Sequence, residues 1–175
     1  MINKLLLACL LVLLWNCSPK SESNTENQVT LSFKVNGLVE QEQHFTATSL
    51  LEMQQLPLGN IQLTKGNGQV YLELNEASGV LLKDVLLSVT VKGQNNKNYS
   101  AYYVVCTAAD GYKTIYSWNE LFNSPIGEQV YLITQANEQA LDQMEQAIMM
   151  VSLGDQITGK RNLRNLAIIE IACMN

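Results

Sequence analysis

The sequence predicts an α+β fold in which a mixed β-sheet is interrupted by short helices. Several segments alternate apolar and polar side chains with period two, which is typical of half-buried strands. Between them lie short stretches with helix-capping patterns. Turns rich in Gly and Asn separate these segments, and the sequence has no internal repeat.

Period-two alternation and apolar runs predict eight strands. Residues 101–107 are apolar on both faces, which predicts a central strand, and Asp110-Gly111 forms the turn that follows it. Residues 66–68, Gly-Asn-Gly, join two alternating segments as a hairpin. The predicted strands are residues 29–35, 61–65, 70–74, 101–107, 112–116, 130–134, 147–151 and 166–171.

Helices are predicted to be short. Ser49 with Glu52, and Ser117 with Glu120, have the spacing of a capping box, which places a helix start at each serine. Residues 80–87 carry apolar side chains on one face and predict a buried helix. Residues 137–146 are polar and predict either a further helix or an excursion of the chain.

The chain begins like a bacterial lipoprotein. Lys4 supplies one positive charge, residues 5–14 form an apolar run, and Cys17 follows shortly after. The pattern predicts a signal peptide over residues 1–16, removed before Cys17, and acylation of that cysteine with palmitate or similar chains. The apolar run is too short to span a bilayer, which needs about 20 residues in a helix. A plain secretory leader is the alternative.

The remainder divides into a tether and one domain. Residues 17–28 are rich in Ser, Asn and Glu, which predicts a flexible linker, and residues 29–175 have the length of a single domain. The lipid would anchor the protein in the bacterial cell envelope. Because no acidic run follows Cys17, we expect the anchored domain to face the periplasm. The membrane, contacted through the lipid, is thus an expected partner.

Charge and composition exclude several function classes. A formal net charge of −5 argues against nucleic acid, which is bound largely through Lys and Arg. His44 is the single histidine and is expected at the surface. No Cys or His pair has the spacing of a zinc site, so we predict no metal site from spacing and no catalytic residues.

After loss of the leader and acylation of Cys17, Cys106 and Cys173 remain as thiols. We favour two buried thiols on separate strands. A disulfide between them is the alternative in an oxidising compartment, because the sequence does not show whether the two sulfur atoms meet.

Three motifs follow one another along the chain. Residues 79–86 read G-V-L-L-K-D-V-L, residues 104–112 end in D-G-Y, and residues 159–166 read G-K-R-N-L-R-N-L. Together with F-T at 45–46 and L-P at 56–57, they resemble the molybdopterin-binding domain of the sulfite oxidase family. The resemblance covers nearly all of the mature domain. It implies the mixed α+β fold of that family, molybdopterin as a cofactor, and a ligand held by loops near basic residues.

The chain departs from that family where the metal would be bound. Catalytic members use a cysteine thiolate as a molybdenum ligand, but no cysteine occurs between Ser18 and Val105. They also have a G-G-P-x-R stretch, and residues 143–149 lack its glycine pair and its arginine. Thiolate is the soft ligand that this metal chemistry needs. We therefore expect no cofactor, although molybdopterin is implied by the resemblance.

Five residues are candidates for ligand binding. Arg161, Arg164 and Lys160 lie near the positions where the resemblance implies an anionic ligand, and Arg and Lys suit that role. Asp110 and Tyr112 belong to the D-G-Y motif. Each has a structural alternative: Asp110 as the cap of its turn, Tyr112 as a half-buried strand residue, and the arginines as a solvated loop.

The function expected from these observations is a lipid-anchored, non-catalytic binding or accessory domain. Its partner would be a small anionic molecule at Arg161 and Arg164, or another envelope protein. Two alternatives stay open. One is a molybdopterin-dependent oxidoreductase with Cys106 as an unusual ligand, and the other is a structural envelope lipoprotein without a small-molecule ligand.

Overall fold

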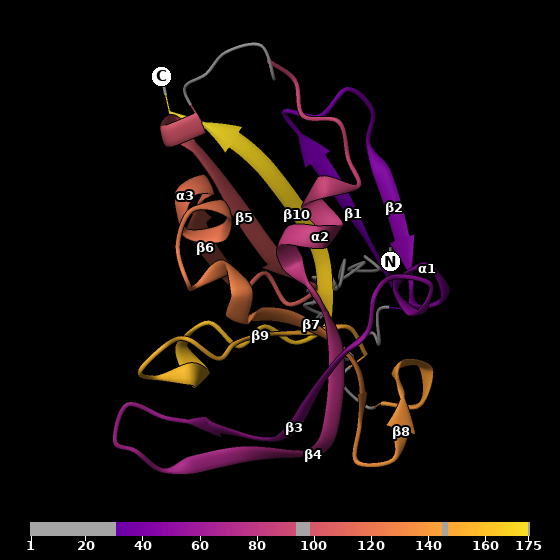
Figure 1. Ribbon diagram of the computed structural model, residues 1–175, viewed down its shortest axis with the longest axis vertical. Helices are drawn as coiled ribbons and strands as arrows, with labels where there is room; N and C mark the ends of the chain where they lie inside the picture. The colour runs from indigo at the N-terminus through magenta and orange to yellow at the C-terminus, as the bar shows by residue number, and fades with distance from the viewer. Residues whose placement is uncertain (1–30, 94–98, 145–146, 175) are drawn as a thin grey trace, which may run out of the picture.

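The structure is a computed structural model that describes residues 31–93, 99–144 and 147–174. The predicted leader and the whole predicted tether, Cys17 included, lie outside these residues. Two five-stranded sheets and three short α-helices make up the described chain (Figure 1). None of the helices in these ranges is both long and apolar enough to cross a bilayer.

The first sheet contains the C-terminal strand in its centre. Its order is β2-β1-β10-β5-β6. Strands β1 and β10 run parallel, whereas the other neighbouring pairs are antiparallel. This mixed sheet confirms the α+β prediction. The strands are β1 (Ser32–Gly37), β2 (Gln43–Thr46), β5 (Tyr102–Ala108), β6 (Lys113–Ser117) and β10 (Leu166–Cys173).

The second sheet is antiparallel and is built on a long hairpin. Its order is β3-β4-β7-β8, and β9 also pairs with β7. The β3–β4 hairpin extends away from the first sheet, at the bottom of Figure 1. The strands are β3 (Leu56–Thr64), β4 (Val70–Leu81), β7 (Val130–Ala136), β8 (Gln139–Ala140) and β9 (Met149–Ser152).

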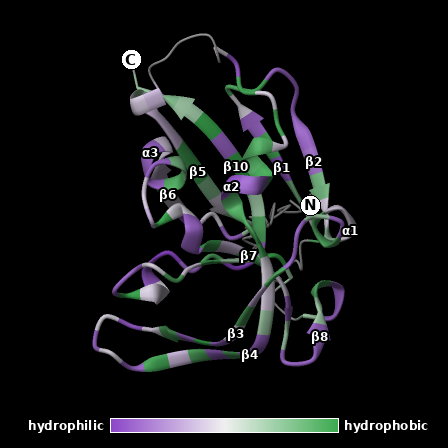
Figure 2. Cartoon of the chain, in the orientation of Figure 1, coloured by the Kyte–Doolittle hydropathy of each residue, from purple (hydrophilic) through white to green (hydrophobic). Residues whose placement is uncertain are grey.

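The larger hydrophobic core covers one face of the first sheet. Along β5, buried and half-buried side chains alternate, with Val104 and Cys106 fully buried. Strand β5 is interior in its sheet, as predicted. Helix α2 (Leu82–Leu87) packs in the core on the face that carries Val104 and Cys106, whereas the side chains on the opposite face of β5 are only half-buried. Apolar segments gather along these central strands in Figure 2. A smaller core joins the hairpin to β7 and β9.

The first helix begins earlier than predicted. Helix α1 (Ala47–Leu51) is capped by Thr46 and not by Ser49. The Thr46 side chain accepts a hydrogen bond from the Ser49 amide, and the Ser49 hydroxyl accepts one from the Thr46 amide. Ser49 thus occupies the third helical position, where a hydroxyl replaces the usual Glu of a capping box. Helix α3 (Trp118–Phe122) has the predicted box of Ser117 and Glu120.

One further boundary differs from the prediction. Helix α2 starts only at Leu82, because the residues before it still pair with β7 as part of β4. Of the two alternatives for residues 137–146, the described residues 137–144 follow the excursion, since Asn137 and Glu138 both have positive φ values and turn the chain into β8. The described residues also form four single 3₁₀ turns: Tyr99–Ala101, Gly127–Gln129, Leu141–Gln143 and Thr158–Lys160 (η4).

The register of β5 and β10 keeps the two remaining thiols apart. Cys106 pairs with Ile169, whereas Cys173 pairs with Tyr102. Four residues along a strand correspond to about 13 Å, which is beyond the reach of a disulfide. The prediction of two separate thiols is confirmed, although Cys173 is only half-buried.

Gly79, the first residue of the first motif, lies where β4 approaches β7 closely. A Cβ atom at this position would come within 2.5 Å of the Leu132 carbonyl oxygen. We expect Gly79→Ala to reduce the free energy of unfolding by about 1–3 kcal/mol through this clash, as measured by urea denaturation. Gly66→Ala is the control, because nothing lies within 4 Å of its Cβ position. Equal unfolding midpoints for the two variants would contradict the prediction.

Candidate ligand-binding site

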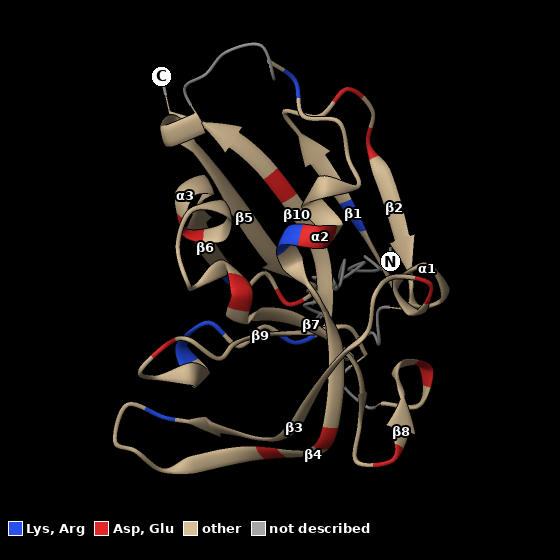
Figure 3. Cartoon of the chain, in the orientation of Figure 1, with Lys and Arg blue, Asp and Glu red and all other residues tan. Residues whose placement is uncertain are grey.

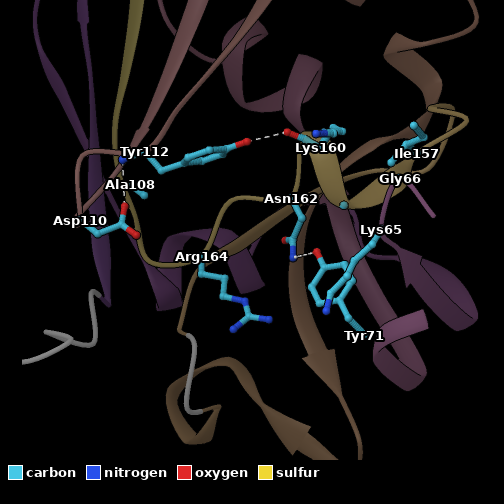
Figure 4. Close-up of a pocket in the computed structure, with 11 residues that line it drawn as sticks. Lys65, Gly66, Tyr71, Ala108, Asp110, Tyr112, Ile157, Lys160, Asn162 and Arg164 are labelled. Atoms are coloured by element: carbon cyan, nitrogen blue, oxygen red, sulfur yellow. Dashed lines mark hydrogen bonds between the residues drawn. The ribbon is translucent and has the colours of Figure 1, made fainter. Parts of the chain in front are cut away.

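A pocket of about 390 Å³ opens where three segments that are far apart in the sequence meet (Figure 4). One segment is the tip of the β3–β4 hairpin, the second is the β5–β6 turn, and the third runs from Ile157 to Arg164. The second and third motifs therefore come together at one site. The residues that line it are Lys65, Gly66, Tyr71, Ala108, Asp110, Tyr112, Ile157, Gly159, Lys160, Asn162 and Arg164.

The β5–β6 turn is held by Asp110. The Tyr112 amide donates a hydrogen bond of 2.9 Å to Asp110 Oδ1, and Gly111 has a φ of +87°, which favours glycine. Asp110 thus has the structural role considered from the sequence, while it also lines the pocket. The Tyr112 hydroxyl donates to the Lys160 carbonyl oxygen at 2.7 Å, which joins the second motif to the third.

The third segment is fixed against the hairpin on its other side. Thr64 N donates to Thr158 Oγ1 at 2.9 Å. Asn162 Nδ2 donates to the Tyr71 hydroxyl at 2.9 Å, as Figure 4 shows. A Cβ at Gly159 would lie 2.7 Å from both the Thr64 carbonyl oxygen and the Tyr71 ring. Glycine at this position therefore lets the segment approach the hairpin closely enough to form the pocket wall.

The pocket is locally basic in an acidic protein. Lys65, Lys160 and Arg164 line it together with one acid, Asp110. In the part of the chain that the structure describes, none of these three cations forms an ion pair. The Arg164 guanidinium carbon lies 6.0 Å from the centroid of the Tyr71 ring. Basic segments on the η4 side and at the hairpin tip are visible in Figure 3.

Arg161 is not among the lining residues. Its Nε and Nη2 donate to the two oxygens of Asp155, and its Nη1 donates to Glu120 Oε1 at 3.2 Å. The guanidinium carbon also lies 4.3 Å from the centroid of the Tyr116 ring. Hydrogen bonding to Asp155 raises the pKa of Arg161 above its ordinary value. The structure thus brings together four of the five candidate residues and places Arg161 elsewhere.

Among the lining residues that were not predicted from the sequence, Lys65, Tyr71 and Asn162 bring polar side chains to the pocket. Lys65 and Tyr71 flank the Gly-Asn-Gly turn of the hairpin, and nothing in their local pattern shows which part of the fold the hairpin tip meets. Asn162 lies inside the third motif, but its uncharged amide carries no charge signal that would mark it as a ligand for an anion.

The residues around this pocket do not fit a molybdenum centre held by a protein thiolate. Cys106 faces the core, does not line the pocket, and burial raises the pKa of its thiol to about 12, so it stays protonated at neutral pH. No Cys or His is among the lining residues. Within residues 31–93, 99–144 and 147–174 there is no group of three or more His, Cys, Asp or Glu side chains suited to a metal ion.

The chain matches no protein-family model and no curated protein. Its fold is similar to that of the sulfane dehydrogenase SoxCD from Paracoccus pantotrophus, known from a crystal structure, with a TM-score of 0.58 and 18% sequence identity. The likeness covers 80% of this chain and 37% of the dehydrogenase chain. The protein therefore spans well under half the length of that neighbour, and at this identity the likeness shows the fold alone.

Proposed function

We propose that this protein is a lipid-anchored, non-catalytic domain of the bacterial cell envelope that binds a small anionic ligand. We further propose that its fold is distantly related to the molybdopterin-binding domain of the sulfite oxidase family. The observation that carries the proposal is the pocket at the meeting point of two motifs. Three cations and no thiol line it, and within the described residues none of these cations forms an ion pair.

The chemistry of the pocket supports an anion as ligand. Lys65, Lys160 and Arg164 offer charge-assisted hydrogen bonds, which are stronger than neutral ones and suit phosphate or carboxylate groups. The rings of Tyr71 and Tyr112 add flat apolar surface, which favours a ligand with a planar part. Asp110 supplies a carboxylate to the pocket wall, and this carboxylate can accept a hydrogen bond from an N–H or O–H group of the ligand.

The position of the cysteines supports a non-catalytic role. With Cys106 in the core, a molybdenum ion at this pocket would have to be held by the pterin alone. A molybdopterin-dependent oxidoreductase is the second candidate function, and the fold likeness to a dehydrogenase is the observation that favours it. The two candidates differ in whether the purified protein contains metal.

The first test measures anion binding. Inorganic phosphate should raise the thermal unfolding temperature of the wild type, because a ligand that binds the native state stabilises it. Arg164→Ala should weaken phosphate binding about tenfold or more, since a hydrogen bond to a charged group contributes about 1.5–3 kcal/mol. Lys92→Ala is the control, because this exposed cation does not line the pocket. Equal phosphate-induced shifts in all three proteins would contradict a basic site at Arg164.

The second test measures metal content. Residues 18–175 are produced in a host that makes the molybdenum cofactor, and molybdenum per protein is determined for the wild type and for Cys106→Ser. We expect background values in both proteins, because the buried thiol does not reach the pocket. Near-stoichiometric molybdenum in the wild type that is lost in Cys106→Ser would establish the oxidoreductase alternative instead.

The third test addresses the anchor, which is proposed from the leader pattern. Cys17→Ala should move the protein from the membrane fraction to the soluble fraction, because its acylation site is removed. Cys9→Ala should leave the protein in the membrane fraction, since Cys9 lies within the leader. Unchanged fractionation of Cys17→Ala would refute lipid attachment at this residue.

A further inference from the structure

Arg161 lies in the middle of the segment that supplies much of the pocket wall, yet its side chain is directed elsewhere. Lys160 and Asn162, its two neighbours, both line the pocket, as does Arg164. The Arg161 guanidinium instead bonds to Asp155 and Glu120. One stretch of chain therefore has a ligand-facing side and a side that is bonded to the rest of the protein.

We propose that Arg161 is a positioning residue: it attaches the segment 158–164 to α3 and β6 and so determines the positions of the Lys160 and Arg164 side chains in the pocket. The inference rests on the proposed anion-binding function of the pocket. It assigns Arg161 a part in ligand affinity without contact to the ligand, in contrast to the direct role that the sequence indicated.

The ion pair with Asp155 fixes the shape of the loop between β9 and β10, to which both residues belong. Two parallel hydrogen bonds join the guanidinium to the carboxylate, so the relative orientation of the two groups is fixed as well as their distance. The side chains of Arg161 and Asp155 are only 19% and 16% exposed, so water and salt screen the pair less than an exposed one.

Glu120 links this loop to helix α3. Its Oε2 accepts a hydrogen bond of 2.7 Å from the Ser117 amide, which completes the capping box of the helix. Its Oε1 accepts from Arg161 Nη1. One carboxylate thus serves both the first turn of α3 and the pocket segment, and the position of the loop follows that of the helix.

Tyr116 provides the third point of attachment. Its ring is fully buried on β6 and lies beneath the guanidinium, an arrangement that favours a cation. The same strand follows directly after Tyr112, whose hydroxyl bonds to the Lys160 carbonyl. Residues 160 and 161 are therefore both attached to the β5–β6 hairpin, one through its backbone and one through its side chain.

The variant Asp155→Asn distinguishes a positioning role of Arg161 from a purely electrostatic effect on phosphate binding. Removing a negative charge close to a basic pocket should by Coulomb attraction alone tighten the binding of an anion. If Arg161 acts by fastening the loop, the same change should weaken binding, because the bidentate pair is lost. The two explanations thus predict effects of opposite sign for Asp155→Asn.

The experiment measures phosphate affinity of the full-length chain in detergent by calorimetry. Asp155→Asn and Arg161→Ala should each bind inorganic phosphate about tenfold more weakly, as for other residues that orient a binding group. The double variant should bind phosphate no more weakly than Arg161→Ala alone, because Asp155→Asn acts through its pair with Arg161 and that pair is already absent in Arg161→Ala. Arg161→Lys keeps the positive charge but loses the two parallel hydrogen bonds of the guanidinium to Asp155, so it should also bind phosphate more weakly. Wild-type or tighter affinity in Asp155→Asn would overturn the proposal.

A second readout does not depend on the ligand. Without phosphate, amide hydrogen exchange over residues 158–164 should be faster in Asp155→Asn and Arg161→Lys than in the wild type. Lys160→Ala is the matched control: it should weaken phosphate binding and leave this exchange unchanged. Absence of phosphate binding in the wild type would overturn the proposed function, whereas unchanged exchange in both loop variants would overturn the role of Arg161.

Discussion

The site depends on the antiparallel pairing of β5 with β10. Because neighbouring antiparallel strands run in opposite directions, the end of β5 lies beside the start of β10, and Ala108 pairs with Leu166. The Ala109 amide continues this contact with a hydrogen bond of 2.9 Å to the Asn165 carbonyl oxygen. The second and third motifs, about fifty residues apart in the sequence, thereby become adjacent loops. The tip of the β3–β4 hairpin supplies the third wall of the pocket.

The sequence predicted which helices and strands occur better than it predicted where each of them begins and ends. Period-two patterns and apolar runs identified eight of the ten strands in the described residues, because each sheet has a face that packs against a core, but they missed the short strands β2 and β8. Strand β4 also continues as far as Leu81 through pairing with β7 that no local pattern reveals. At the site, the D-G-Y and third motifs pointed to four of the lining residues. The contribution of Lys65 and the separation of Arg161 from Arg164 depend on tertiary partners, such as Asp155 and Glu120, that spacing alone does not identify.

The depth of Cys106 within β5 decides what its thiol can contact. Ala108, at the end of the strand, lines the pocket, whereas Cys106, two residues earlier on the same face, is fully buried in the core and does not line it. The fold is shared with a dehydrogenase, whereas the donor groups around the pocket are cationic and aromatic. Fold and chemistry are therefore separate questions in this protein.

The parallel pairing of β1 with β10 decides where the chain enters the domain. Lys34 pairs with Ile168, so both strands start at the same edge of the sheet, and this is the edge from which the pocket loops emerge. The chain therefore enters the domain beside the binding loops. Under the lipid anchor proposed at Cys17, the tether would join the domain at the edge that carries the pocket.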